Sequence, residues 1–144
     1  MQILESRGYD SCGIASITRD EEGNPVFELT KFASSDRFGG DCIKRMALEG
    51  ASRHNHCVGI GHTRWATHGD KTDINAHPHF DHKKRVALVH NGIITNYHEL
   101  KTKIEQNEGI KPVSGTDTEI VAILIGLYLD KGESLSKAID LATQ

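Results

Sequence analysis

An unusually apolar stretch near the C-terminus, residues 120–129, restricts the folds that this chain can adopt. The polar run Thr116-Asp117-Thr118-Glu119 comes directly before it in the pattern of a helix capping box, and Gly132 lies where such a helix should end. A helix this apolar needs a sheet to cover. The sequence therefore predicts an α/β or α+β architecture in which helices pack on strands.

The rest of the chain contains segments that suit such a layered fold. Two short β-prone runs flank the turn-forming segment 20–25 and predict a hairpin. Asn96-Tyr97-His98-Glu99 has the capping-box form and predicts a helix that stops near Gly109. The segment 69–85 has no clear period and should be an ordered loop or a surface excursion. In full, we expect strands at 13–17, 26–32, 58–62 and 86–90 and helices at 42–51, 96–109, 120–129 and from 135 onward.

Length, charge and cysteine content narrow the class of protein. A chain of 144 residues suits one domain with its own core, and a net charge of -3 gives no field that favours nucleic acid or an anionic membrane. The sequence shows no signal-peptide pattern and no apolar run long enough to span a bilayer. The three cysteines, Cys12, Cys42 and Cys57, form neither a disulfide framework nor a CxxC pair. We therefore expect a cytoplasmic protein, with Cys42 and Cys57 as buried small apolar side chains.

Polar groups beside the predicted strands have the chemistry of an amino-acid receptor. Arg64 offers a bidentate fork for a carboxylate, and Thr67 and His68 can add further donors. Asp117, in the first turn of a predicted helix, is a fixed anion that can pair with an ammonium group. Polar groups collected at strand ends are more typical of a site than of a core.

A further pair, Asn91-Gly92, follows the predicted strand at 86–90. The Asn side-chain N–H and the Gly amide could converge on one developing negative oxygen, as in an oxyanion hole. With the two receptors above, this arrangement fits an α-amino acid attacked at a side-chain carbonyl, and only the nucleophile is lacking. Each group also has a structural explanation: Asp117 as a helix cap, Asn91-Gly92 as a hairpin turn and Arg64-Trp65 as a surface stacking pair.

The joint order of these groups is that of a known family. The chain resembles the glutaminase domain of the class II glutamine amidotransferases, which are N-terminal-nucleophile hydrolases. Within that family it is most similar to the branch that transfers nitrogen to fructose 6-phosphate. The matching segments are 7–11, 62–69, 75–78, 90–97 and 116–119.

The resemblance implies a role for each of the site residues and implies neither a cofactor nor a metal. Arg64, Thr67 and His68 would bind the α-carboxylate of glutamine, and Asp117 would bind its α-amino group. Asn91 and Gly92 would form the oxyanion hole. Trp65 would lie in a loop that closes over the bound glutamine.

The resemblance also implies an architecture and partners. The fold would be α+β, the αββα sandwich of N-terminal-nucleophile hydrolases, with residues 1–144 as a partial glutaminase domain incomplete at both ends. The substrate would be L-glutamine, and its ammonia would pass to fructose 6-phosphate in an isomerase domain that is absent from this sequence. The full-length enzyme would be a cytoplasmic homo-oligomer with no nucleic-acid or membrane partner.

The chain departs from the family at its start. In the family an N-terminal cysteine thiol attacks the side-chain amide while its own α-amine acts as base, whereas this sequence begins Met1-Gln2-Ile3. Cys12 cannot replace that nucleophile, because it lies in a predicted strand and its amine is part of a peptide bond. We interpret the sequence as part of a working aminotransferase, and we expect the 144-residue chain alone to release no ammonia from glutamine.

Three other interpretations are open at this stage. The first is a zinc module, although no second compact pair of ligands completes either candidate set. Those sets are His54, His56 and Cys57 with His62, and His77 and His79 with His82. The second is a non-catalytic domain that binds glutamine or a partner. The third is the glutaminase domain of another class II amidotransferase, with the same site and a different acceptor.

Overall fold

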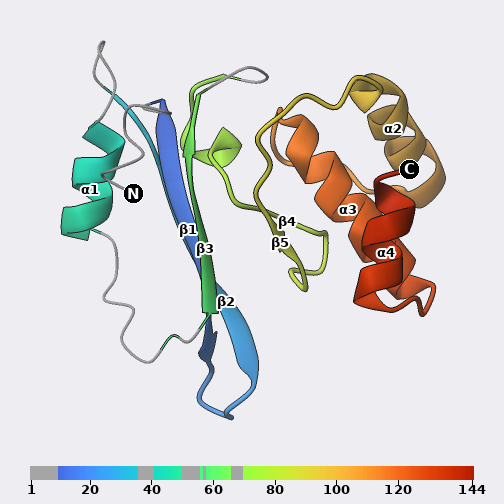
Figure 1. Ribbon diagram of the computed structural model, residues 1–144, viewed down its shortest axis with the longest axis horizontal. Helices are drawn as coiled ribbons and strands as arrows, with labels where there is room; N and C mark the ends of the chain where they lie inside the picture. The colour runs from blue at the N-terminus through green and yellow to red at the C-terminus, as the bar shows by residue number, and fades with distance from the viewer. Residues whose placement is uncertain (1–9, 36–40, 50–55, 57, 66–69) are drawn as a thin grey trace. The chain divides into compact units, whose positions relative to one another are not determined.

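A computed structural model of the protein describes residues 10–35, 41–49, 56, 58–65 and 70–144 (Figure 1). The chain divides into two compact units, Met1–Pro78 and His79–Gln144. Both contain antiparallel strands and helices, which confirms the α+β class. In these ranges, every helix is too short or too polar to cross a bilayer.

A three-stranded antiparallel sheet with the order β2-β1-β3 forms the first unit. The predicted hairpin is confirmed as β1 (Ser11–Arg19) and β2 (Pro25–Ala33). The carboxylate of Asp20 organises the turn between them, since it accepts hydrogen bonds from the amides of Glu22 and Asn24 at 3.1 and 2.7 Å. The strand β3 (Val58–Arg64) runs two residues further than the predicted 58–62, because its end pairs with the start of β1.

The helix α1 (Asp41–Glu49) packs on β1 and β2 and closes a small core on one side of this sheet. The prediction at 42–51 is confirmed to Glu49, and its expected end at 50–51 lies outside the described residues. Two cysteines and Ile43 form the buried centre of the core, with Phe32 and Met46 against it. Both cysteines, Cys12 and Cys42, are fully buried, as expected for Cys42; Cys57 lies outside the described residues. A hydrogen bond with Cys42 and burial both raise the pKa of the Cys12 thiol, so Cys12 stays protonated.

A short antiparallel ladder of β4 (His79–Phe80) and β5 (Ala87–Leu88) begins the second unit. The strand predicted at 86–90 is therefore only two residues long. Just before it, the amide of Val86 donates to the side chain of Asp81 at 2.9 Å, and the carbonyl of Val86 accepts from the amide of Asp81 at 3.2 Å. The segment 69–85 is ordered in its described part, but the prediction missed β4 and a 3-10 turn at Asp73–Asn75.

Three helices complete the second unit, and each was expected from the sequence. They are α2 (Tyr97–Lys103), which continues as a π-helical turn (Ile104–Glu108), α3 (Asp117–Asp130) and α4 (Leu135–Ala142). The apolar α3 packs against α2, α4 and both strands of the ladder (Figure 1). Its Ile120 and Ile123 form the core of the unit with Tyr97 and Ile104. This packing explains why α3 is apolar on nearly every side.

Both predicted capping boxes are wrong. Asn96 makes no side-chain cap bond, and Glu99 instead accepts from Lys103 Nζ at 2.6 Å, one turn along the helix. Thr116 also makes no cap bond, because its hydroxyl lies 2.9 Å from His79 Nε2. Other side chains thus take the groups that the capping patterns assign to the helix ends: a neighbour one turn along α2 for Glu99, and a distant histidine for Thr116.

An ion cluster joins the ladder to the C-terminal end of α3. The fully buried carboxylate of Asp81 accepts from the guanidinium of Arg85 at 2.9 Å, and Arg85 also pairs with Asp130 at 2.6 Å. Hydrogen bonds from Lys83, with further ones from Arg85 and His82, hold the pKa of the Asp130 carboxyl well below its ordinary value.

We expect Asp130→Asn to lower the thermal midpoint of the protein at pH 7. Because the pKa of Asp130 is depressed by folding, its contribution to stability is present above the unfolded pKa of about 4 and is lost as the pH falls through the folded value. The deficit of the variant should therefore shrink on acidification, which thermal unfolding by circular dichroism from pH 7 to pH 2 would measure. Asp140→Asn, which removes an exposed carboxylate from α4, is the control. It should leave the thermal midpoint at its native value at every pH in this range.

Candidate functional site

Asp117 is the first residue of α3, and its side chain is buried, with 5 % of the residue exposed. Its Oδ2 accepts a hydrogen bond from the amide of Ile94 at 2.8 Å, and the hydroxyl of Thr118 lies 3.4 Å from its Oδ1. Within the described part of the chain, no cationic side chain pairs with it. A buried carboxylate whose protein contacts are neutral has an unmet electrostatic demand that a bound cation would satisfy, beyond what the helix dipole supplies.

A buried polar network holds the loop that leads into Asp117. The carboxylate of Glu119 accepts from the amides of Val113 and Ser114 at 2.9 and 2.6 Å and from the Ser114 hydroxyl. That hydroxyl lies 2.9 Å from the hydroxyl of Thr116, which in turn contacts His79. The network therefore fixes the chain just before α3, so that the position of Asp117 is set from both sides.

Sequence reasoning missed this network. The predicted capping box made Glu119 reach back to the amide of Thr116, whereas in the structure it accepts from the amides of Val113 and Ser114. The usable signal was a glutamate in the first turn of α3 after the run Ser114-Gly115-Thr116, whose small polar groups can bond within a loop. No local pattern indicates His79, because it is 37 residues away from its partner Thr116.

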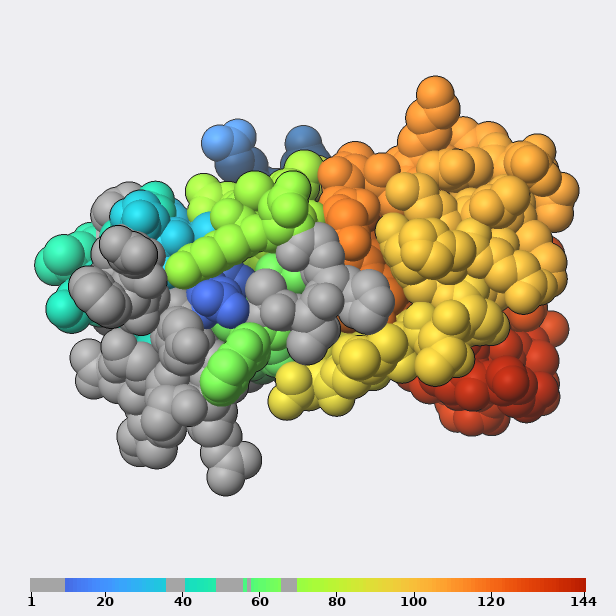
Figure 2. All heavy atoms as spheres, turned by 90° about the horizontal axis from the view of Figure 1, so that it is seen from above, coloured from blue at the N-terminus to red at the C-terminus, as the bar shows by residue number. Residues whose placement is uncertain are grey.

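Asn91 and Gly92 are exposed and lie in the irregular segment between β5 and α2. Atoms of this segment, yellow in Figure 2, lie at the molecular surface. No strand follows this pair before α2, so the hairpin-turn explanation of Asn91-Gly92 is wrong. A Cβ on Gly92 would lie 2.6 Å from Nε2 of the His90 ring, so any larger residue here would have to displace that ring.

Arg64 and Trp65 lie in the first unit, at the end of β3. Arg64 is the last residue of the strand, in register with Ser11, and is 4 % exposed, whereas Trp65 is 58 % exposed. A surface stacking pair would expose both side chains, so the structure contradicts that explanation. A buried guanidinium at a strand end suits an anion receptor. The other two predicted carboxylate ligands, Thr67 and His68, lie outside the described residues.

Several histidines of the described ranges contact other side chains one at a time. The ring of His62 packs against that of His77, with centroids 4.6 Å apart. His56 Nδ1 lies 2.8 Å from the Ser16 hydroxyl, and His82 Nε2 lies 2.9 Å from Asp130. Nowhere in those ranges do three or more His, Cys, Asp or Glu side chains form a group that could hold a metal. Two residues of the zinc hypothesis, His54 and Cys57, lie outside the described residues.

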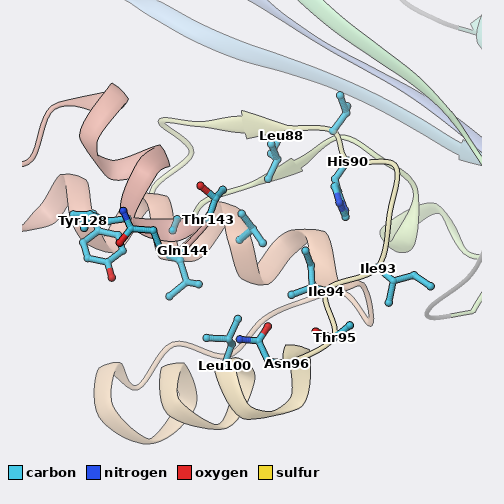
Figure 3. A pocket seen from close by; sticks show the side chains of 15 residues that line it. Leu88, His90, Ile93, Ile94, Thr95, Asn96, Leu100, Tyr128, Thr143 and Gln144 are labelled. Atoms are coloured by element: carbon cyan, nitrogen blue, oxygen red, sulfur yellow. The ribbon is translucent and has the colours of Figure 1, made fainter.

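The second unit also contains an apolar pocket of about 470 Å³ (Figure 3). Segments of the loop after β5, of α3 and of the C-terminal end contribute to it. Its walls include Leu88, His90, Ile94, Leu100, Leu124 and Tyr128. None of the three predicted site residues of this unit, Asn91, Gly92 and Asp117, lines it. An apolar pocket of this kind lacks the charged groups that a zwitterionic amino acid requires, so it is distinct from the candidate site.

Comparison with known proteins supplies the context for these residues. The model of the glutamine amidotransferase domain family matches residues 11–140. Glutamine–fructose-6-phosphate aminotransferase [isomerizing] of Aeropyrum pernix is 45% identical over 144 residues, which cover 98% of this chain. The enzymes of the same name from Aquifex aeolicus and Staphylococcus aureus are 46% and 41% identical, over 87% and 96% of this chain. The chain spans about a fifth of the length of these relatives, between 19% and 21%.

Proposed function

Because the chain belongs to the glutamine amidotransferase domain family, we propose that it forms part of the glutaminase domain of an aminotransferase. The reaction is hydrolysis of the side-chain amide of L-glutamine to glutamate, with release of ammonia. By analogy with the named relatives, the acceptor of that ammonia is fructose 6-phosphate, bound by a separate isomerase domain. The product is then glucosamine 6-phosphate.

The observation that carries this proposal is the buried carboxylate of Asp117. It contacts the Ile94 amide and the Thr118 hydroxyl, both neutral, so an ammonium group is the ligand that would complete its environment. The same helix start is tied to the segment that contains Asn91 and Gly92. In the proposed reaction, the α-amino group of glutamine binds Asp117, and the amide oxygen becomes negative as its carbonyl is attacked. The Asn91 side chain and the Gly92 amide then donate to that oxygen.

The remaining predicted ligands act on the other end of the amino acid. The guanidinium of Arg64 would hold the α-carboxylate in a bidentate contact, with Thr67 and His68 as additional donors. Its burial at the end of β3 supports this role, since a desolvated guanidinium binds an anion more strongly than an exposed one. The exposed indole of Trp65 follows directly and would cover the bound substrate.

The wider context of the domain is part of the same proposal. We infer the αββα sandwich of N-terminal-nucleophile hydrolases, in which a thiol of an N-terminal cysteine attacks the amide carbonyl. We also infer that the full-length enzyme is a cytoplasmic homo-oligomer. The sheets and helices described above are compatible with that sandwich.

The native full-length protein should form glutamate from glutamine and, when fructose 6-phosphate is present, should transfer the amide nitrogen to the sugar phosphate. Glutamine with an isotopically labelled amide nitrogen, followed by mass spectrometry of the sugar product, measures both steps. Glutamate formation with no label in the sugar would assign the domain to another amidotransferase. Glutamine binding without hydrolysis would make it a non-catalytic receptor and would overturn the proposal.

A further inference from the structure

The first turn of α3 holds both ends of the segment 90–94. Oδ2 of Asp117 accepts from the amide of Ile94 at 2.8 Å, at the C-terminal end of the segment. The hydroxyl of the next residue, Thr118, lies 3.5 Å from Nδ1 of His90, at the N-terminal end. Two consecutive residues of one helix thus tie down a five-residue segment, with the two proposed oxyanion donors between the ties.

The imidazole of His90 packs directly on the backbone of the segment. A Cβ built on Gly92 would lie 2.6 Å from Nε2 and 2.9 Å from Cε1 of that ring, so the ring occupies the space next to the Gly92 Cα. His90 also borders the apolar pocket (Figure 3). The ring therefore fills the volume between the pocket and the segment, and its removal would leave the Gly92 peptide unsupported.

We propose that His90 is a positioning residue for the oxyanion hole. Its ring, in contact with Thr118, fixes the peptide at Gly92 so that the amide N–H is in place before the amide carbonyl of glutamine is attacked. Donors that are already oriented stabilise a developing negative charge without reorganising during the reaction. This inference rests on the proposed glutaminase function. It adds a residue that acts through Gly92 rather than on the substrate itself.

The test compares His90→Ala with the native full-length protein in steady-state glutamine hydrolysis. Misplacement of a catalytic donor by about 1 Å can cost about a hundredfold in rate, so we expect kcat to fall about 10- to 100-fold. KM for glutamine should stay within about twofold, because the groups that bind the α-carboxylate and α-amino group are unchanged. The affinity for glutamate, which develops no oxyanion, should likewise be unchanged. The affinity for an aldehyde analogue of glutamine, which becomes tetrahedral on attack, should fall together with kcat.

Two further variants separate positioning from a general loss of structure. His98→Ala removes an exposed histidine from α2 in the same unit and should leave all four quantities at their native values. His90→Phe keeps a flat ring beside Gly92 and should retain more than about a third of the native kcat, since packing rather than proton transfer is the proposed contribution.

Distinct outcomes would overturn the inference and the proposed function. If the native protein hydrolyses glutamine and His90→Ala keeps its kcat, His90 does not position the oxyanion hole. The same conclusion follows if glutamate affinity falls in parallel with kcat, or if His90→Phe is as slow as His90→Ala. If the native protein itself forms no glutamate, the proposed function fails instead, before any variant is compared.

Discussion

Asp117→Ala should lower kcat/KM for glutamine by at least about a hundredfold in the native full-length protein. Removal of one partner of a buried ion pair costs about 3–5 kcal/mol, and each 1.4 kcal/mol corresponds to about a factor of ten. The same change removes the acceptor that holds the amide of Ile94 at 2.8 Å. We therefore expect both an increase in KM and a fall in kcat, measured as initial rates of glutamate formation.

Asp117→Asn separates these two effects. The amide oxygen of asparagine can still accept from Ile94, whereas the negative charge that would bind the ammonium group is gone. KM for glutamine should rise strongly while kcat stays closer to its native value than in Asp117→Ala. The thermal midpoint should change little, because loss of a favourable contact with the helix dipole, about 0.3–1 kcal/mol, is offset by removal of a buried charge.

If Asp117 had only a structural role, Asp117→Asn would leave KM for glutamine unchanged instead of raising it. If the carboxylate served only as a helix cap, Asp117→Asn would be a good replacement in activity, since asparagine caps helices as well as aspartate does. Unchanged KM in this variant would therefore remove the ammonium-binding role. It would not affect the assignment of Asn91 and Gly92, which is tested by kcat.

The elements that the sequence predicted correctly are those governed by local periodicity. The apolar run at 120–129 and the turn-forming segment 20–25 each dictate a structure through neighbours a few residues away, and both α3 and the β1–β2 hairpin were expected. The strand β4 was missed because two residues carry no period. It is fixed instead by its pairing with β5 and by the side chain of Asp81, which accepts hydrogen bonds from the backbone amides of Arg85 and Val86.

In the candidate site, as in the fold, the sequence predicted the features that depend on neighbouring residues and missed the contacts with distant ones. Asp117 was correctly placed in the first turn of a helix, because its position follows from the local pattern. The contacts that orient it were not predictable, since they come from distant segments: Ile94 is 23 residues away, and His79 reaches Thr116 over 37. The capping pattern failed at Thr116 for this reason, since a distant histidine competes for its hydroxyl, whereas the pattern at Asn96 failed because Glu99 pairs with Lys103 within the same helix.

Gly13→Ala should destabilise the first unit by about 3 kcal/mol or more, although glycine is usually the weaker residue in a strand. Gly13 lies in the central strand β1, where a Cβ would come within 2.0 Å of the carbonyl oxygen of His77. That oxygen belongs to the backbone of the segment 73–78, which is hydrogen-bonded to the neighbouring strand β2. Lys31 Nζ donates to the carbonyls of Ile74 and Pro78 at 3.1 and 3.2 Å.

The control is Gly59→Ala in the neighbouring strand β3. There the added Cβ would lie 3.2 Å from the carbonyl of Ala15, a contact that small shifts can relieve, so the change should cost less than about 1 kcal/mol. Chemical denaturation of each variant, with hydrogen exchange of the β1 amides to assign the loss to this sheet, measures the difference. Because both added Cβ atoms would meet a backbone carbonyl and only the one at Gly13 would overlap it, equal stability of the two variants would mean that the segment 73–78 does not lie against β1 in solution. A large deficit confined to Gly13→Ala would instead show that the segment lies against β1 and supports the sheet there.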